Sequence, residues 1–299
     1  MCQAIPIEIG SNKVLLIDTP GFDDTERSDS DILTEIARLL AAQYELGIEL
    51  KGVIYLHRIT DVRYQRSSVK TLQIFKEICG KDALKNVLLV TTRWGEVEGS
   101  VGADRERQLR DKFWAYMLAN GSMISRYYGD RDSAVGIATQ LLGKSTVVLD
   151  LQRELVENGK NLSETAAGAL VDQDLENRKK EYREEIAALE RARQDMLEGN
   201  SAMRKQFERD WAREQARLEQ AQKQQANLQT NVASEVRTEI RNESQRKKTG
   251  LSKLLPFIPT VLSLLGMFVG IPPGSFELLT GWFTDFGNDD SVTEFFSSF

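Results

Sequence analysis

The stretch of the sequence with the clearest chemical content is Asp18-Thr19-Pro20-Gly21-Phe22-Asp23-Asp24-Thr25, which directly follows the apolar run 14–17. A buried strand that ends in aspartate and turns at an Asp-x-x-Gly sequence brings a carboxylate and a bare backbone N–H to one end of a sheet. The carboxylate of Asp18 suits a Mg²⁺ ion contacted through water, and the N–H of Gly21 can approach a γ-phosphate because glycine has no Cβ. The alternative interpretation is a strand followed by a Pro-Gly turn with an aspartate cap.

This stretch resembles the motif that senses magnesium and the γ-phosphate in P-loop GTPases, most closely in their septin-related and immunity-associated group as found in fungal proteins. The resemblance continues through the runs 55–59, 86–92 and 152–156, and it covers residues 3–170. It implies a Ras-like doubly wound α/β sheet, with GTP and Mg²⁺ as cofactors. It also implies that Asp18 is the metal-side carboxylate and that the nucleotide contacts Asp18, Thr19, Gly21, Thr92 and Arg93.

The phosphate loop of that family, G-x-x-x-x-G-K-[ST], surrounds the phosphates with backbone amides and a lysine. It should precede Asp18 by tens of residues, but only 17 residues precede Asp18 here, and their pattern predicts a hairpin. Gly143-Lys144-Ser145 has the ending of the motif, yet position 138 is Ala138 rather than glycine, and the run follows a predicted helix. We therefore interpret Gly143 as a helix end and expect the Ras-like fold in an N-terminally truncated form.

Two further positions limit what a nucleotide site could do here. Thr92-Arg93-Trp94-Gly95 stands where the family has [NT]-K-x-D, so the stem of Arg93 can lie over a purine, while Gly95 replaces the aspartate that reads guanine. The alternative interpretation of this stretch is a strand end with Trp94 packed on the edge of the sheet. Phe22 stands where Ras-like enzymes have the glutamine that orients the attacking water. We expect no catalytic residue in this chain, and slow or no hydrolysis of GTP.

Composition restricts the classes of function. The 299 residues carry a net charge of −6, which does not favour nucleic-acid binding. The two cysteines have no pairing pattern and suit a reducing compartment, and residues 1–10 lack the pattern of a signal peptide. His57 is the only histidine, and we favour a structural role for it over a metal site. We expect a cytoplasmic protein, with the cytoplasmic face of a membrane as the alternative location.

The first 150 residues alternate predicted strands and helices, which is typical of a doubly wound α/β sheet. Alternation and turn residues predict a β-hairpin from the runs 5–9 and 14–17. Helical spacing predicts a helix that begins at Ser28 and stops at Gly47. The further predicted strands are 52–56, 87–91 and 123–127, and the further predicted helices are 67–79, 105–118 and 133–142.

In a Ras-like sheet, the strand before the phosphate loop lies between the strands that correspond here to 14–17 and 52–56. Without that strand, the two neighbours either pair directly or keep unpaired edges inside the sheet. Each buried backbone group without a partner costs about 1–3 kcal/mol. We therefore expect a marginally stable chain unless the gap closes.

Residues 175–248 are rich in charged residues, glutamine and alanine, and their apolar residues recur every three, four or seven positions. Between Phe207 and Trp211 the apolar positions shift by four residues out of the preceding heptad register, which is a stutter in the heptad-like pattern. Three interpretations remain open: a coiled coil through which two chains self-associate, a helical hairpin folded on its own domain, and a single solvated helix.

The C-terminal region has no charged residue from Leu254 to Phe276, and 11 of its residues 254–271 are Leu, Ile, Val or Phe. Those 18 residues would span about 27 Å as a helix, close to the apolar thickness of a bilayer. Pro256 and Pro259 weaken that prediction. Membrane contact through 254–276 and a hydrophobic hairpin packed on protein are both open.

We therefore predict four segments: a truncated GTPase-like domain at 1–150, a connecting segment at 151–172, a helical region at 173–248 and a hydrophobic tail at 249–299. Two functions follow. The first is a GTP-binding switch, in which nucleotide binding by these residues is weak because the phosphate loop is missing. The alternative is a non-catalytic interaction, scaffold or membrane-associated protein that keeps a GTPase-like architecture and holds no cofactor.

Overall fold

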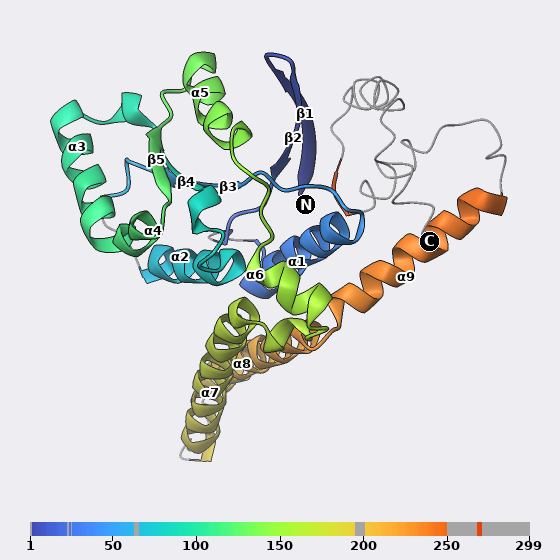
Figure 1. Cartoon of the computed structure of the whole chain (residues 1–299). Coiled ribbons are helices and arrows are strands. Elements are labelled where there is room, and N and C mark those ends of the chain that lie inside the picture. Colours follow the sequence, from blue (N-terminus) through green and yellow to red (C-terminus); the bar gives the residue numbers. More distant parts are fainter. Residues whose placement is uncertain are drawn as a thin grey trace.

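A computed structural model describes residues 2–22, 24, 26–62, 66–194, 201–249 and 268–270 (Figure 1). The strands are β1 (Gln3–Ile9), β2 (Asn12–Asp18), β3 (Val53–Arg58), β4 (Val87–Thr92) and β5 (Met123–Arg126). The α-helices are α1 (Asp29–Glu45), α2 (Arg66–Cys79), α3 (Gly99–Gln108), α4 (Ala115–Ala119), α5 (Arg131–Leu142), α6 (Asp150–Gln152), α7 (Ala166–Gln194), α8 (Ser201–Leu228) and α9 (Val232–Thr249). Short 3-10 turns are η1 (Leu84–Asn86), η2 (Trp94–Glu96) and η5 (Leu162–Glu164), and π-helical turns are η3 (Leu109–Phe113) and η4 (Arg153–Glu157).

The described strands form two separate sheets. The hairpin β1–β2 is antiparallel, with Gln3 opposite Asp18, and β3, β4 and β5 form a parallel sheet in that order. Helices connect the parallel strands, so the predicted α/β class is confirmed at this level. The predicted hairpin, the three further strands and the helix after Ser28 are all present.

Strand β4 is buried on both faces, and a separate cluster of apolar side chains packs against each face. Val87 and Leu89 face the main core with α1 and α2, whereas Leu88 and Val90 pack against Ile137 and other residues on the α5 side. Figure 1 shows α5 on one side of the sheet and α1 and α2 on the other. A continuous apolar run is what a strand covered on both faces requires.

The helix predicted at 105–118 differs from the structure. It begins earlier, at Gly99, and is interrupted by the π-helical turn η3 before α4. Leu109 and Trp114 are both buried although they are five positions apart, a spacing that a regular α-helix does not place on one face. The wider π-turn supplies the extra residue that brings both side chains to the core.

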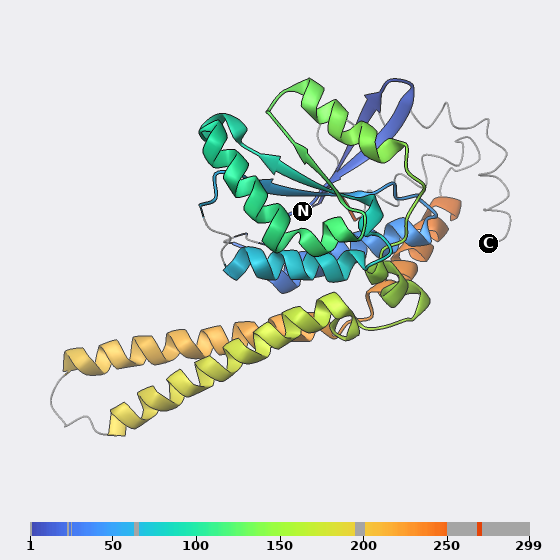
Figure 2. The ribbon, with the colours of Figure 1, turned by 60° about the vertical axis from the view of Figure 1, so that its left-hand side comes forward.

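The helical region forms a long hairpin within the chain. Figure 2 shows α7 and α8 lying side by side and extending away from the sheets, and α9 continues from α8 along α1. The predicted boundary between 172 and 173 falls inside α7, because this helix already begins at Ala166. The boundary after 150 falls inside α6.

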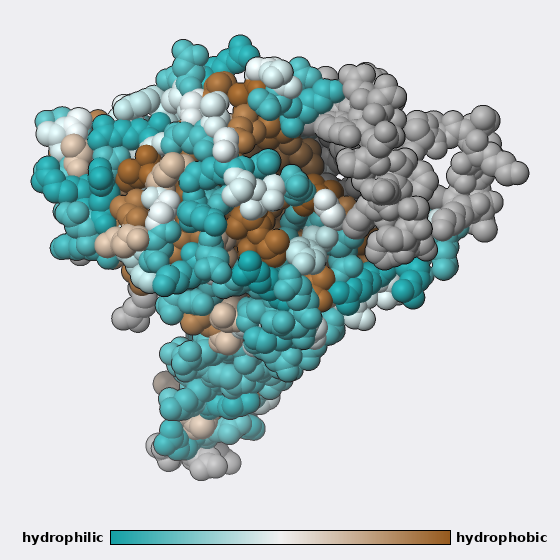
Figure 3. Space-filling view, in the orientation of Figure 1, coloured by the Kyte–Doolittle hydropathy of each residue, from teal (hydrophilic) through white to brown (hydrophobic). Residues whose placement is uncertain are grey.

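The two sheets are not joined between β2 and β3. Neither strand pairs with the other, so the gap that the sequence left open does not close by direct pairing of the described strands. Leu16 on β2 and Leu56 on β3 are 38% and 65% exposed. Figure 3 shows apolar side chains in the hollow between α5 and the hairpin. We call the region between β2 and β3, with Leu16 and Leu56, the sheet slot.

Among the described residues, no helix is long and apolar enough to cross a membrane. Of the predicted hydrophobic tail, only residues 268–270 are described, and the rest of 254–276 lies outside the described residues.

Candidate functional site

Asp18 is the last residue of β2, and the loop after it is open to solvent. Asp18, Thr19 and Gly21 are exposed, and the carbonyl of Gly21 accepts a hydrogen bond from the N–H of Asp24 at 3.2 Å. A Cβ added to Gly21 would meet nothing within 4 Å. Packing therefore does not explain the glycine, and its backbone has room for a ligand group. Phe22 instead packs against the main core.

Thr92 and Arg93 lie at the carboxyl end of β4. The carbonyl of Thr92 accepts from the N–H of Ile59 at 3.0 Å, which ties this end of the strand to the residue after β3. Arg93 has a φ of 64°, a left-handed conformation that is uncommon for a residue other than glycine. Its guanidinium lies 3.3 Å from the carboxylate of Glu96. A Cβ added to Gly95 would also meet nothing within 4 Å.

The two groups of residues lie on different sheets. Asp18, Thr19 and Gly21 belong to the hairpin sheet, whereas Thr92 and Arg93 belong to the parallel sheet across the slot. Within the described residues, no cluster of three or more metal-ligating side chains forms. Magnesium in nucleotide sites takes one or two carboxylates plus phosphate oxygens, so Asp18 fits a metal carried by a nucleotide rather than one held by protein alone. Among these five residues, Asp18 alone carries a group that suits such a magnesium ion.

One cluster at this end of the sheet had no signal in the sequence. The guanidinium carbon of Arg126 lies 4.1 Å from the ring centre of Trp94, and Arg126 Nε donates to Glu106 at 3.0 Å. Glu106 is buried, and this pairing raises the pKa of Arg126 above its ordinary value. Trp94 Nε1 donates to the hydroxyl of Thr91 at 3.0 Å. The cluster borders an open cleft of about 530 Å³ between α3, β5 and α5.

The contacts of His57 and Gly143 agree with the structural roles that the sequence predicted for them. The ring of His57 meets Trp114 edge-on, with centroids 6.1 Å apart, which supports the structural role expected for it. Gly143 is the C-cap of α5, and its N–H donates to the carbonyl of Leu141, as its interpretation as a helix end predicted. Lys144 donates through Nζ to the carbonyl of Lys85.

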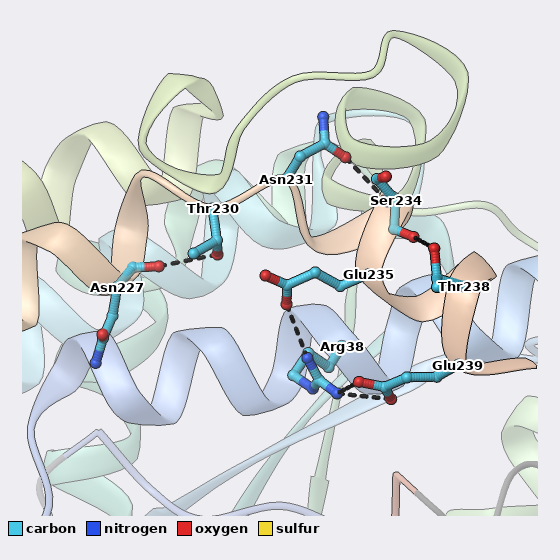
Figure 4. A network of polar contacts seen from close by, with 8 residues as sticks. All are labelled: Arg38, Asn227, Thr230, Asn231, Ser234, Glu235, Thr238 and Glu239. Atoms are coloured by element: carbon cyan, nitrogen blue, oxygen red, sulfur yellow. Dashed lines mark hydrogen bonds and ion pairs between the residues drawn. The ribbon is translucent and has the colours of Figure 1, made fainter. Parts of the chain in front are cut away.

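The helix that follows the Asp18 loop is fixed to several other elements. At its start, Lys70 of α2 lies 2.6 Å from Asp29 and 2.8 Å from Asp174 of α7, so one ammonium joins three helices. Farther along, Arg38 donates to Glu235 at 3.0 Å and to both oxygens of Glu239 at 2.6 and 2.8 Å (Figure 4). A movement of α1 would therefore change its contacts with α2, α7 and α9.

No protein-family model matches this chain, and no curated protein matches it either. The resemblance to P-loop GTPases therefore rests on the residues quoted above and stays a prediction.

Proposed function

We propose that this chain is a GTP-binding switch protein whose nucleotide site is completed by a further strand and phosphate-binding loop in the sheet slot. In this proposal the carboxylate of Asp18 orients water on the nucleotide-bound Mg²⁺. Thr19 and Gly21 contact the γ-phosphate, and Thr92 and Arg93 flank the base.

The observation that carries the proposal is the break between β2 and β3. A strand placed there would join the hairpin and the parallel sheet into one sheet and would cover Leu16 and Leu56. It would end beside Asp18 and beside the carboxyl ends of β3 and β4. Ligands of open α/β sheets bind at such carboxyl ends, next to a change in strand order.

The proposed switch hydrolyses GTP slowly. Phe22 packs against the core and has no polar group with which to orient water. Gly95 has no carboxylate to read guanine, so discrimination between guanine and adenine is weak.

The test is a fusion that places a strand, a G-x-x-x-x-G-K-S loop and a helix before Gln3. We expect submicromolar GTP binding by calorimetry, together with a raised melting temperature that shows that the segment has docked. There are two matched controls. Changing the lysine of the added loop to alanine should abolish GTP binding. Asp18→Ala should make GTP binding depend less on Mg²⁺. A fusion that melts higher but binds GTP no better than the unfused chain would contradict the proposal.

A second function, a non-catalytic interaction protein, is favoured by the hairpin of α7 and α8. This hairpin extends from the sheets and exposes Met203 and Trp211, which are 52% and 37% accessible. Exposed apolar residues on a polar helix suit a protein partner or a second copy of the chain. Sedimentation of the chain with and without Trp211→Lys tests this: a dimer that the substitution dissociates supports it, and a monomer in both cases contradicts self-association.

A further inference from the structure

A second open cleft, of about 560 Å³, lies at the amino end of β4. Lys85 lines it and lies two positions before the start of that strand, whereas Thr92 and Arg93 lie at the strand's other end. The cleft is therefore separate from the proposed contacts with the nucleotide base. We call it the basic cleft, and the lining residues that matter here are Lys81, Asp82, Lys85, Asn120, Thr146 and Arg153.

The lysines of the basic cleft have no acidic partner. Lys81 and Lys85 are exposed, and among the described residues their ammonium groups form no ion pair or hydrogen bond. Lys144 lies beside them, because its Nζ donates to the carbonyl of Lys85, and it too pairs with no carboxylate in the described part of the chain. Three ammonium groups therefore gather here in a chain whose net charge is −6.

The other polar groups of the cleft can also serve a ligand. The guanidinium of Arg153 lies 3.3 Å from Asp150 and 3.7 Å from Asp82, and all three side chains are at least 40% exposed. Exposed pairs of this kind contribute little to stability, so a stronger anion can replace them. The hydroxyl of Thr146 is exposed and has no partner among the described residues.

The walls of the cleft are held together by buried hydrogen bonds. The side-chain amide of Asn86, which is 1% exposed, donates to the carbonyls of Lys51 and Ser145, both at 2.7 Å. The hydroxyl of Ser122 donates to the carbonyl of Leu84 at 2.8 Å, and Leu84 is also 1% exposed. The turn that carries the lysines is therefore anchored in the core, so the cleft is formed before a ligand arrives.

These groups suit phosphate. A lysine ammonium is a compact charge that binds phosphate oxygens, and arginine and hydroxyl groups donate hydrogen bonds to them. Because more than one ammonium group lacks a counter-charge, a ligand with a single charge would leave part of the cleft unneutralised. A volume of about 560 Å³ lies within the range of pockets that hold small molecules.

We propose that the basic cleft binds a small molecule with two or more phosphate groups, either free in solution or as the headgroup of a lipid. Lys81 and Lys85 bind the phosphate oxygens, Arg153 exchanges its exposed carboxylate contacts for a phosphate, and Thr146 donates a hydrogen bond. The proposal does not depend on GTP binding at the carboxyl ends of the strands.

The measurement is calorimetric titration of the full chain with inorganic pyrophosphate. A magnesium chelator is present, so that a site that requires Mg²⁺ contributes nothing. We expect saturable binding that the double substitution Lys81→Gln/Lys85→Gln weakens about tenfold, which is about 1.4 kcal/mol.

The matched control is Lys112→Gln/Lys223→Gln, which removes two other exposed lysines and changes the net charge equally. It should leave the affinity for pyrophosphate within about twofold of wild type. Both double variants should keep the wild-type melting temperature, because all four side chains are exposed.

Three results would overturn the proposal. They are no saturable binding of pyrophosphate, an equal loss of affinity in the two double variants, and binding of a hexaglutamate peptide as tight as that of pyrophosphate. The last result would mean that the cleft takes carboxylates of an acidic protein segment instead.

Flotation with phosphatidylcholine vesicles that contain phosphatidylinositol bisphosphate distinguishes the two sources of phosphate. Flotation that Lys81→Gln/Lys85→Gln lowers and the control pair does not would support a lipid headgroup. Saturable pyrophosphate binding without such flotation would support a free phosphate compound.

Discussion

At the scale of single residues, the best-defined polar contacts lie at the carboxyl ends of β4 and β5. Glu106 is buried and receives the guanidinium of Arg126, which also covers the face of Trp94. Asp18, Thr19 and Gly21, in contrast, are exposed. The contacts of Arg126 with Glu106 and Trp94 hold the carboxyl ends of β4 and β5 in place.

Replacing Arg126 with methionine should lower the free energy of unfolding by about 1–3 kcal/mol, because the buried carboxyl group of Glu106 would lose its hydrogen bonds from the guanidinium. Arg107→Met is the matched control. Arg107 pairs with Asp104 on the exposed side of the same helix, at 3.1 Å, and surface pairs contribute less than about 1 kcal/mol. Urea unfolding of both variants checks this, and equal effects would show that the Glu106 pair is not special.

The two cysteines make stability depend on pH at the alkaline end. Burial, the main cause, together with the nearby Glu35, raises the pKa of Cys2 to about 12, and burial also raises the pKa of Cys79 above its ordinary value of 9.0. Above pH 9 the unfolded chain loses these protons while the folded chain keeps them, so stability falls as pH rises. We expect lower urea midpoints at pH 10 than at pH 8, and a smaller fall in Cys79→Ala. A loss of equal size in that variant would assign the effect to other groups.

At the scale of elements, the order and type of the predicted strands and helices agree with the structure because their signals are local. The Ser28 cap is an example, since its hydroxyl accepts from the N–H of Asp31 at 3.2 Å. Signals that depend on tertiary packing were missed. The π-turn before Trp114 has no sequence marker, and the meeting of Arg126 with Trp94 joins residues 32 positions apart. Likewise, heptad spacing alone could not decide between a hairpin and two associating chains.

The hairpin of α7 and α8 contains a polar residue where an apolar one would pack. Glu214 is 3% exposed and lies 3.0 Å from Arg213 and Arg217, which are half-exposed and can return to water. Glu214→Leu should therefore stabilise the hairpin by about 1 kcal/mol, because a buried charge is replaced by an apolar side chain of similar size.

Slower amide exchange in α7 and α8 would report that gain, with Glu219→Leu on the exposed face as the control. Glu214 also raises the pKa of Glu185 across the hairpin, by a hydrogen bond and by charge repulsion. That pKa should fall in Glu214→Leu. Faster exchange together with an unchanged Glu185 titration would show that the two helices do not pair in this register.

At the scale of the whole molecule, the main feature is a core divided at the sheet slot. The hairpin sheet packs on α1, and the parallel sheet packs on α2 and α5, so α1 and the main core rather than strand pairing hold the two sheets together. A strand edge with exposed leucines also invites aggregation. We expect the chain to melt below about 60 °C, in the range of mesophile domains or lower. A cooperative calorimetric transition well above that temperature would show that the divided sheet is stable without an added strand.

Our central proposal is that Asp18, Thr19, Gly21, Thr92 and Arg93 border a nucleotide site, and that the given 299 residues contain no phosphate-binding loop to complete it. The most direct test is calorimetric titration of the 299-residue chain with GTP and Mg²⁺. Without loop amides and a lysine, the triphosphate lacks most of its charge-assisted hydrogen bonds, each of which contributes about 1.5–3 kcal/mol. We predict no affinity tighter than about 100 μM, which is about 5.5 kcal/mol of binding free energy. Submicromolar binding of GTP that Asp18→Ala weakens would contradict the account, because the phosphates would then be held by residues that it assigns no such role.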